Sequence, residues 1–366
     1  MQLLEYYHHQ KVKNDFFIPR KSLLPTTSAL NLYGVRGAGK SSLAIDTLLE
    51  VEKEKALYID CQDPNFTLSP LLLSSLQHYI EVHSITHLVL DHYQEGLLPS
   101  FPQVRHLIVV TRIPLDNTSL EPFELFPLDY EEFLAFEGGN ISTKGFNHFL
   151  RVGTLPLVAK TPKQTMTLFK LFFQSAFSPK EQELLLILAQ QQTNHITIHQ
   201  LYTFTKERFK ISKDWLYRTI KEFEKEKILF FLPESYHKSG KKLILFDFAF
   251  PKYLSHRQSF STQFDTMVAL TLLKHHIPIK TLGKEGYITQ EGELIMPAPF
   301  ESEERLWLKA QNSFSLYKKF SIQKITIVTV ANHYQFKIEK IHFEALPFTE
   351  WSILNDSDLH HTKSEV

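Results

Sequence analysis

Short apolar runs alternate with longer segments of mixed polarity along the first third of the chain. Four of these runs have the length of strands buried on both faces, and they cover 29–33, 56–59, 87–90 and 106–110. A helix-length segment separates each run from the next, which is typical of a parallel sheet whose strands are joined by helices. The pattern therefore predicts an α/β fold with a parallel sheet in this region.

From Ser178 the pattern is that of consecutive helices. Apolar residues recur at helical spacing over 179–190, 198–209 and 214–226. Two strand-like runs, 228–232 and 242–248, then flank a turn-rich stretch. Three helices followed by a β-hairpin are the order of a winged helix.

After Pro251 helices and strands alternate again. The helices are expected near 264–275 and 301–314, and the strands near 286–288, 293–296 and 324–330. This order predicts a second, smaller α/β region.

Composition narrows the partners that this chain can have. Its 366 residues include 40 Lys and Arg against 40 Asp and Glu, so no overall field attracts nucleic acid, and a nucleic-acid surface would have to be a local patch. The single cysteine, Cys61, cannot form an intramolecular disulfide and fits a reducing compartment. The first residues lack the pattern of a secretion signal, and no apolar run approaches the roughly 20 residues of a membrane span. We expect a cytoplasmic protein without a membrane contact.

The strongest chemical signal is a glycine-rich loop after the first predicted strand. Residues 34–41 fit the spacing G-x-x-x-x-G-K-[ST] between a strand and a helix. In this motif backbone N–H groups cradle phosphates, the lysine reaches the β- and γ-phosphates, and the hydroxyl ligates magnesium. We expect ATP with Mg²⁺ to be bound by Gly34, Val35, Arg36, Gly37, Ala38, Gly39, Lys40, Ser41 and Ser42.

A carboxylate follows the third predicted strand. Asp91 comes after three apolar residues and would complete the magnesium site with Ser41. The next residue is His92, where hydrolysing proteins of this class usually place a glutamate that orients or deprotonates the attacking water. A neutral His92 can accept a proton, and Glu95 is close in sequence, but neither is the usual arrangement. We therefore expect slow or impaired hydrolysis.

Several segments in this order resemble prokaryotic AAA-type ATPases, which are similar to the STAND signalling NTPases and carry a winged helix and a nuclease-like C-terminal domain. Segment 56–60 with Asp63-Pro64 resembles the second strand and its acidic turn, and 88–94 resembles the Walker B segment apart from His92. Segment 107–112 is similar to a sensor strand. The resemblance implies that Thr111 meets the γ-phosphate and that Arg112 senses the nucleotide. The candidate catalytic residues are then Lys40, Asp91, His92 and Arg112.

Two further segments carry the resemblance past the sheet. Segment 126–134 recurs in this family in almost this form, and Gly153-Thr-Leu-Pro156 is similar to a turn that packs against the bound nucleotide. Each also has a structural interpretation: Arg112 as a surface residue, Pro156 as the first residue of a helix, and Glu131 with Glu132 as a solvated helix face.

The C-terminal part resembles the family's nuclease domain with a departure. Segment 264–268 is similar to a nuclease-domain helix, and 284–300 takes the place of the metal-binding strands. Where active members carry Asp, Glu and Lys, this chain has Tyr287, Ala298 and Phe300. Such replacements remove the magnesium ligands and the lysine that steadies the nucleophile. Glu291 and Glu293 lie close by in the sequence, so an active nuclease site stays an alternative.

The predicted protein is an α/β protein in four parts. These are a P-loop ATPase domain with a helical lid (1–177), a winged-helix domain (178–250), a degenerate nuclease-like α/β domain (251–355) and a flexible tail (356–366). Three functions are open: an ATP-dependent regulatory switch that acts on an unknown protein partner, a DNA-binding protein in which ATP is mainly structural, and an ATP-dependent nuclease. An arginine acting across a subunit interface is also open, with Arg105 and Arg151 as candidates.

The predicted helix from Asp214 carries the candidate contacts to double-stranded DNA. Its apolar face should be buried and consists of Leu216, Ile220 and Phe223. The opposite face would then present Lys213, Tyr217, Arg218, Lys221 and Lys225, and the hairpin would add Lys238, Lys241 and Lys242. Three glutamates interrupt this helix, and a lysine-rich face is often only solvated, so both interpretations stay open.

Overall fold

The computed structural model describes residues 2–10, 12, 14, 17–25, 27–68, 71–136, 143–161, 164–236, 240–255 and 259–353. The chain divides into two compact units, Met1–Pro127 and Leu128–Val366. Residues 128–177 of the predicted first domain thus fall in the second unit, and the predicted boundaries at 177, 250 and 355 stay predictions. The tail over 356–366 and Lys238 lie outside the described residues. Among the residues described, no helix is long and apolar enough to cross a membrane.

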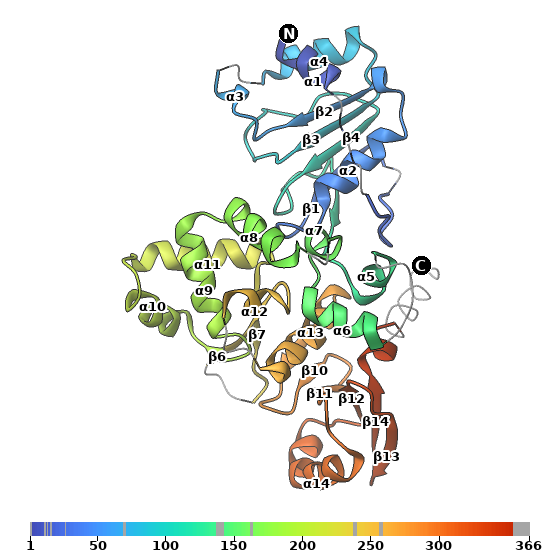
Figure 1. The fold of residues 1–366 in the computed structure, drawn as a ribbon, viewed down its shortest axis with the longest axis vertical. Coiled ribbons are helices and arrows are strands. Elements are labelled where there is room, and N and C mark those ends of the chain that lie inside the picture. Colours follow the sequence, from blue (N-terminus) through green and yellow to red (C-terminus); the bar gives the residue numbers. More distant parts are fainter. Residues whose placement is uncertain are drawn as a thin grey trace. The chain divides into compact units, whose positions relative to one another are not determined.

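The first unit is built on a five-stranded parallel sheet (Figure 1). Its strands are β1 (Ala29–Tyr33), β2 (Ala56–Asp60), β3 (His87–Asp91), β4 (His106–Val110) and β5 (Glu121–Glu124), in the order β2-β3-β4-β1-β5. This confirms the predicted parallel sheet and its first four strands. Because β4 lies between β1 and β3, the glycine-rich loop, Asp91 and Thr111 all follow neighbouring strands at the same edge of the sheet.

Helices cover both faces of this sheet. The helices α1 (Gln2–His9) and α4 (Leu73–Val82) pack on one face, where their buried residues meet Leu57, Leu88 and Leu107. Helix α2 (Lys40–Leu49) lies on the other face. The chain crosses the sheet in one direction from β1 to β2 and in the opposite direction from β2 to β3, and right-handed crossovers in opposite directions put their helices on opposite faces. Two covered faces explain why the strands are continuous apolar runs rather than alternating ones. The short helices η1 (Lys53–Lys55) and α3 (Asn65–Leu68) complete the unit.

The second unit begins with helices and a small antiparallel sheet. Its first four helices are α5 (Tyr130–Phe136), α6 (Thr143–Val152), α7 (Pro156–Ala159) and α8 (Thr165–Ala176). The next three, α9 (Pro179–Gln190), α10 (Ile198–Lys206) and α11 (Lys213–Lys225), occur in the predicted order. A sheet of order β6-β8-β7 accompanies them, formed by β6 (His195–Ile196), β7 (Leu229–Pro233) and β8 (Lys241–Leu245). The interpretation of these elements as a winged helix stays a prediction.

Hydroxyl side chains fix the starts of these three helices. Ser178 and Thr197 each form a capping box with the residue three positions later, and the Ser212 side chain accepts a hydrogen bond from the Trp215 N–H. On α11 the predicted apolar face is confirmed, since Leu216, Ile220 and Phe223 are fully buried.

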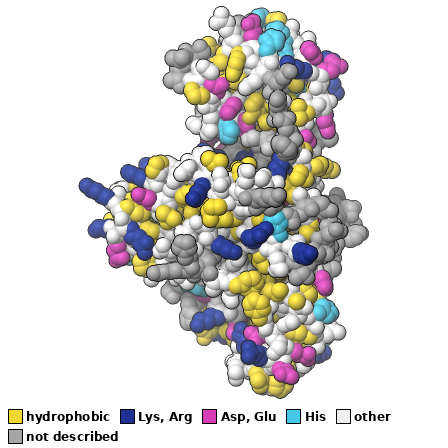
Figure 2. Space-filling model, viewed as in Figure 1, with side chains coloured by type: hydrophobic (Ala, Val, Ile, Leu, Met, Phe, Trp, Pro, Cys, Tyr) yellow, Lys and Arg dark blue, Asp and Glu magenta, His cyan; other side chains and the backbone are white. Residues whose placement is uncertain are grey.

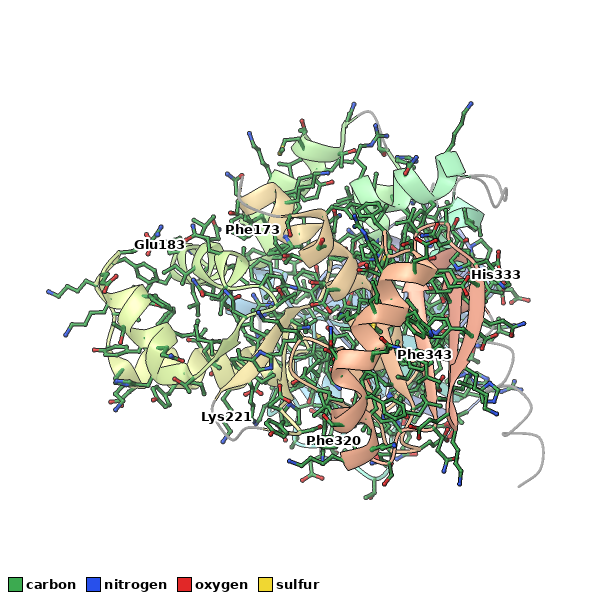
Figure 3. All side chains as sticks on the ribbon, turned by 90° about the horizontal axis from the view of Figure 1, so that it is seen from below. Phe173, Glu183, Lys221, Phe320, His333 and Phe343 are labelled. Atoms are coloured by element: carbon green, nitrogen blue, oxygen red, sulfur yellow. The ribbon has the colours of Figure 1, made fainter. Side chains whose placement is uncertain are left out.

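The last part of the second unit is a mixed six-stranded sheet. The sheet has the order β13-β14-β12-β11-β10-β9 and consists of β9 (Ile279–Thr281), β10 (Tyr287–Thr289), β11 (Leu294–Pro297), β12 (Lys324–Thr329), β13 (Tyr334–Ile338) and β14 (Ile341–Pro347). Helix α14 (Glu303–Lys319) packs on it, and Phe343 of β14 stacks on Phe336 and meets the Tyr317 ring of α14 (Figure 3). Helices α12 (Phe250–Leu254) and α13 (Phe260–Lys274) precede the sheet.

Buried polar contacts join the parts of the second unit. The Lys274 ammonium of α13 lies 2.9 Å from Asp129 Oδ2 and 3.0 Å from Glu132 Oε2, and these two acids cap the start of α5. The buried Asp247 carboxylate accepts hydrogen bonds from the Thr154 N–H and hydroxyl and from the N–H groups of Ala249 and Phe250. Segment 126–134 therefore has a structural role, because its acids fasten α5 to α13.

One predicted DNA contact is wrong. Lys242 is 8% exposed, and its Nζ lies 2.6 Å from Asp265 Oδ2 and 4.6 Å from the centroid of the Tyr287 ring. Lys242 points inward because side chains alternate along β8, and its charge is neutralised inside the unit. Lys241, the preceding residue, is exposed as predicted.

Loss of the Lys274 charge should destabilise the second unit. We expect Lys274→Met to lower its free energy of unfolding by about 2 kcal/mol, below the roughly 3–5 kcal/mol of a fully buried pair, because 19% of the Lys274 side chain stays exposed. The matched control is Lys318→Met, whose pair with Glu339 is 58% exposed on both sides and should contribute about 0.5 kcal/mol or less. Urea unfolding measures both values, and equal losses would contradict the assignment of Lys274 as the fastening residue.

Candidate phosphate-binding site

The glycine-rich loop has the backbone conformation that its sequence predicts. Gly37 and Gly39 have φ values of 82° and 96°, in the left-handed region that a side chain opposes, and Gly34 has a φ of 141°. A Cβ at Gly34 would lie 2.2 Å from the Leu125 carbonyl oxygen. Glycine is therefore required where the loop leaves β1, since strand β5 runs directly beside it.

Positive charge is concentrated inside this loop. Helix α2 begins at Lys40, so its first N–H groups and the positive end of its dipole face the loop. The Lys40 ammonium donates to the carbonyl oxygens of Gly34 and Val35, at 2.8 and 2.9 Å. These carbonyl groups hold the ammonium within the loop, where an anionic oxygen could replace them as its partner.

Asp91 is an oriented, fully buried carboxylate at the end of β3. Its Oδ2 accepts a hydrogen bond from the Tyr58 hydroxyl at 2.7 Å, and its Oδ1 accepts one from the His92 N–H at 2.8 Å. Val89 and Asp91 point to one face of β3 and Leu88 points to the other. The face with Val89 and Asp91 is the one that α2 covers. This placement suits a carboxylate that holds a cation near Ser41, which is half-buried at the start of α2.

His92 is held by a second acid, Asp60, at the end of β2. The His92 backbone has a φ of 52°, a left-handed conformation that is uncommon for a non-glycine residue. Its Nδ1 lies 2.9 Å from Asp60 Oδ1, so Nδ1 carries the proton and Nε2 is the acceptor of the neutral ring. The hydrogen bond to Asp60 raises the pKa of His92, against burial and the Lys40 charge, and it lowers the pKa of Asp60.

Thr111 is buried behind the site rather than presented to it. Its hydroxyl donates to the Ile113 carbonyl at 2.6 Å and accepts from Asn31 Nδ2 at 2.9 Å. Asn31 is a buried residue of β1 that also binds the chain after β4 through Leu115 N. The predicted contact of Thr111 with a γ-phosphate would require these bonds to rearrange and stays a prediction.

The other predicted residues are distributed over both units. Arg36 and Val35 are buried in the loop, whereas Ser42, Glu95 and Arg112 are exposed around it. Pro156 is the first residue of α7 and belongs to the second unit, so its contact with a nucleotide stays a prediction. Arg105 and Arg151 are exposed, as a role at a subunit interface would require.

Sequence reasoning missed three residues that build the site: Arg20, Asn31 and Asp60. The Arg20 guanidinium donates to the carbonyl oxygens of Ala38 and Phe126, both at 2.8 Å. Asn31 was detectable as a polar residue inside an apolar strand, and Asp60 as a second acid that ends a strand. Arg20 precedes β1 in a stretch without a periodic pattern, and no local signal marks it.

Basic side chains gather on the surface of α10 and α11 in the second unit (Figure 2). Lys213, Tyr217, Arg218, Lys221 and Lys225 of α11 are exposed, as predicted, and Figure 3 shows Lys221 near the edge of the unit. Lys206, Arg208 and Lys210 add exposed charges that the sequence analysis did not single out. Arg218 Nε lies 3.9 Å from Glu222, so part of this positive charge is offset within the helix.

The expected nuclease positions contain no metal-binding group. Tyr287 is fully buried and its hydroxyl donates to Asp265 Oδ1 at 2.6 Å, Ala298 is buried, and the exposed Phe300 stacks on Phe260. Glu293 is paired with Lys324 and accepts a hydrogen bond from Thr326. Within the part of the chain that the structure describes, no group of three His, Cys, Asp or Glu could hold a metal ion. The nuclease-like fold itself stays a prediction.

No protein-family model matches this chain, and no curated protein matches it either. Among solved structures, one similar chain is the Orc1 protein of Aeropyrum pernix, solved in complex with DNA. The two are 14% identical, the match covers 64% of this chain and 87% of the Orc1 chain, and the TM-score is 0.31. A similarity of this size does not establish a shared fold or function.

Removal of the Asp60 carboxylate should release His92. We expect Asp60→Asn to lower the pKa of His92 toward its ordinary value of 6.5, because the hydrogen bond to Asp60 is the main cause of the raised value. NMR titration of the histidine ring protons measures this shift, with Asp63→Asn as the matched control. A His92 pKa that does not change in Asp60→Asn would show that the two side chains are not paired in solution.

The same pair makes stability depend on pH in a defined direction. The contribution of His92 is full below pH 6.5 and is lost as pH rises through its raised folded-state pKa. The contribution of Asp60 is lost as pH falls through its lowered folded-state pKa. The pair therefore stabilises the first unit mainly at pH values between the lowered pKa of Asp60 and the raised pKa of His92.

Proposed function

We propose that this protein binds ATP with Mg²⁺ in the loop from Gly34 to Ser41 and works as a slow nucleotide-dependent switch. The observation that supports this most is the loop conformation: left-handed glycines, a held lysine and a helix N-terminus face one another. Asp91 and Ser41 would hold the magnesium ion. Magnesium would neutralise charge on the phosphates and bridge them to the protein.

The environment of His92 supports slow hydrolysis. A water-activating base must be unprotonated, and the pairing with Asp60 raises the pKa of His92, so a larger fraction is protonated at neutral pH. Asp60 also fixes the ring through Nδ1. A histidine with a raised pKa offers a smaller unprotonated fraction at neutral pH than the usual glutamate would.

A switch also requires a part that responds to the nucleotide. We propose that the second unit has this role and that it passes the state of the loop to a protein partner. The fastening of α5 to α13 by Lys274, and of the Thr154 turn to Asp247, favours movement of this unit as one body. Arg112, exposed after β4, would distinguish ATP from ADP.

Substitutions in the first unit should separate binding from hydrolysis. We expect Lys40→Ala to abolish binding of ATP with Mg²⁺, because it removes the charge that faces the β- and γ-phosphates. His92→Glu should keep binding and raise turnover, since general-base catalysis is commonly worth roughly a hundredfold or more. His92→Gln is the matched control without a base, and Arg112→Ala should reduce the preference for ATP over ADP. Calorimetry measures binding, and phosphate release measures turnover.

Two results would contradict this account. Undiminished ATP binding by Lys40→Ala would mean that the loop is not the nucleotide site. Ordinary turnover by the wild type, reduced in His92→Glu, would make His92 or Glu95 a working catalytic group.

DNA binding by the second unit is a second candidate function, favoured by the exposed basic residues of α11. The candidate contacts are Lys213, Tyr217, Arg218, Lys221 and Lys241, with Lys242 excluded by its burial. Phosphate contacts by such residues are independent of DNA sequence and weaken with salt. The nuclease alternative has no comparable observation in its favour among the described residues.

A double substitution on α11 tests this candidate. If α11 contacts DNA phosphates, Arg218→Ala with Lys221→Ala should weaken binding and reduce the slope of log affinity against log salt by about 2. The control pair, Lys280→Ala with Lys337→Ala, removes two exposed charges elsewhere in the same unit. Mobility shifts at several salt concentrations measure the slope. Absence of binding by the wild type at low salt, or equal effects of both pairs, would favour a protein-docking role.

A further inference from the structure

Arg20 links the phosphate loop to the last residues of the first unit. Its guanidinium is 8% exposed and donates from Nη1 to Ala38 O and from Nη2 to Phe126 O, each at 2.8 Å. Ala38 lies in the middle of the loop, and Phe126 immediately precedes the end of the unit at Pro127. Because a guanidinium is planar and rigid, a movement of one carbonyl group either carries the other with it or breaks a hydrogen bond.

The start of the loop is held to the same segment. Leu125 N donates to Tyr33 O at 2.8 Å, and the Cα of Gly34 approaches Leu125 so closely that no Cβ would fit. The loop is therefore connected to the departing chain at two points, at its start through the bond between Tyr33 and Leu125, and in its middle through Arg20, which binds both Ala38 and Phe126.

The chain is fixed again as soon as it enters the second unit. Leu128 N donates to Thr154 O at 2.9 Å, and Asp129 caps α5 and pairs with Lys274. The segment joining the units is thus held by the phosphate loop before Pro127 and by helices of the second unit after it.

We propose that Arg20 is a positioning residue that couples the phosphate loop to the segment joining the two units. When the loop N–H groups turn toward the phosphates of a nucleotide, the planar peptide groups carry their carbonyl oxygens with them. Arg20 transmits the movement of Ala38 O to Phe126, and the orientation of the second unit follows. This inference rests on the proposed function, because it requires a nucleotide in the loop.

The test measures binding and coupling separately in the full chain. Spin labels on Glu54→Cys in the first unit and Lys337→Cys in the second, with Cys61→Ser, report the distance between units with and without ATP and Mg²⁺. We expect a nucleotide-dependent change in this otherwise wild-type chain. Arg20→Gln should lose most of that change at saturating ATP, while its affinity for ATP falls by no more than roughly tenfold, the equivalent of about one hydrogen bond.

Two further variants separate coupling from a general effect on the fold. Arg20→Lys keeps the charge but lacks the planar fork, so it should restore only part of the change; if Arg20→Gln does not fold, this variant decides the question. Arg305→Gln, an exposed arginine of α14, should behave as the wild type.

The outcomes distinguish this inference from the function on which it rests. Arg20 variants that keep the whole change would overturn the coupling through Arg20 and leave the proposed switch intact. A wild type that binds ATP without a change in distance would overturn both the coupling and the switch and leave only ATP binding. A wild type that does not bind ATP would overturn both.

Discussion

The close approach of Gly34 to the Leu125 carbonyl is the constraint on which the rest of the site depends. It sets the point at which the chain leaves β1, and so the path of the loop that brings Lys40 back to the Gly34 and Val35 carbonyls. Because β5 lies beside β1, the same contact joins the loop to the strand through which the chain leaves the first unit. The glycine-rich loop and the chain that leaves the first unit are therefore parts of one arrangement, reinforced by the two hydrogen bonds of Arg20.

The acids at the carboxyl edge of the sheet have distinct roles. Asp91 is buried and oriented by Tyr58, as suits a magnesium partner, whereas Asp60 is occupied by His92. The residue after Asp91 is thus held to the neighbouring strand through Nδ1, which leaves Nε2 as the only basic nitrogen of its neutral ring. Under the proposed function, a loop that keeps every group of its motif, beside a histidine in place of the usual glutamate, is better suited to holding a nucleotide than to rapid turnover.

Much of the fold could be predicted from sequence, and the failures have physical reasons. Strands β1 to β4 are buried on both faces and therefore stand out as apolar runs, but β5 begins with the exposed Glu121 and Pro122 and lies at the edge of the sheet. The loop motif predicts Lys40 and Ser41 because its spacing is local, and Asp91 is predicted as an acid that ends an apolar run. Arg20, Asn31 and Asp60 act on partners that lie far away in sequence, up to 106 residues for Arg20, and only the assembled sheet brings them together. The same limit applies to Lys242, whose inward direction depends on the register of β8 and on Asp265 of α13.

The most direct test of the central claim is a crystal structure of the full chain grown with Mg²⁺ and a non-hydrolysable ATP analogue. The account predicts β- and γ-phosphates surrounded by the N–H groups of Gly37 to Ser41, with Lys40 Nζ moved from the Gly34 and Val35 carbonyls to the phosphate oxygens. It also predicts magnesium between the Ser41 hydroxyl and the Asp91 carboxylate. An analogue bound elsewhere, or a loop that stays empty at saturating analogue with Lys40 still on its own carbonyl groups, would contradict it.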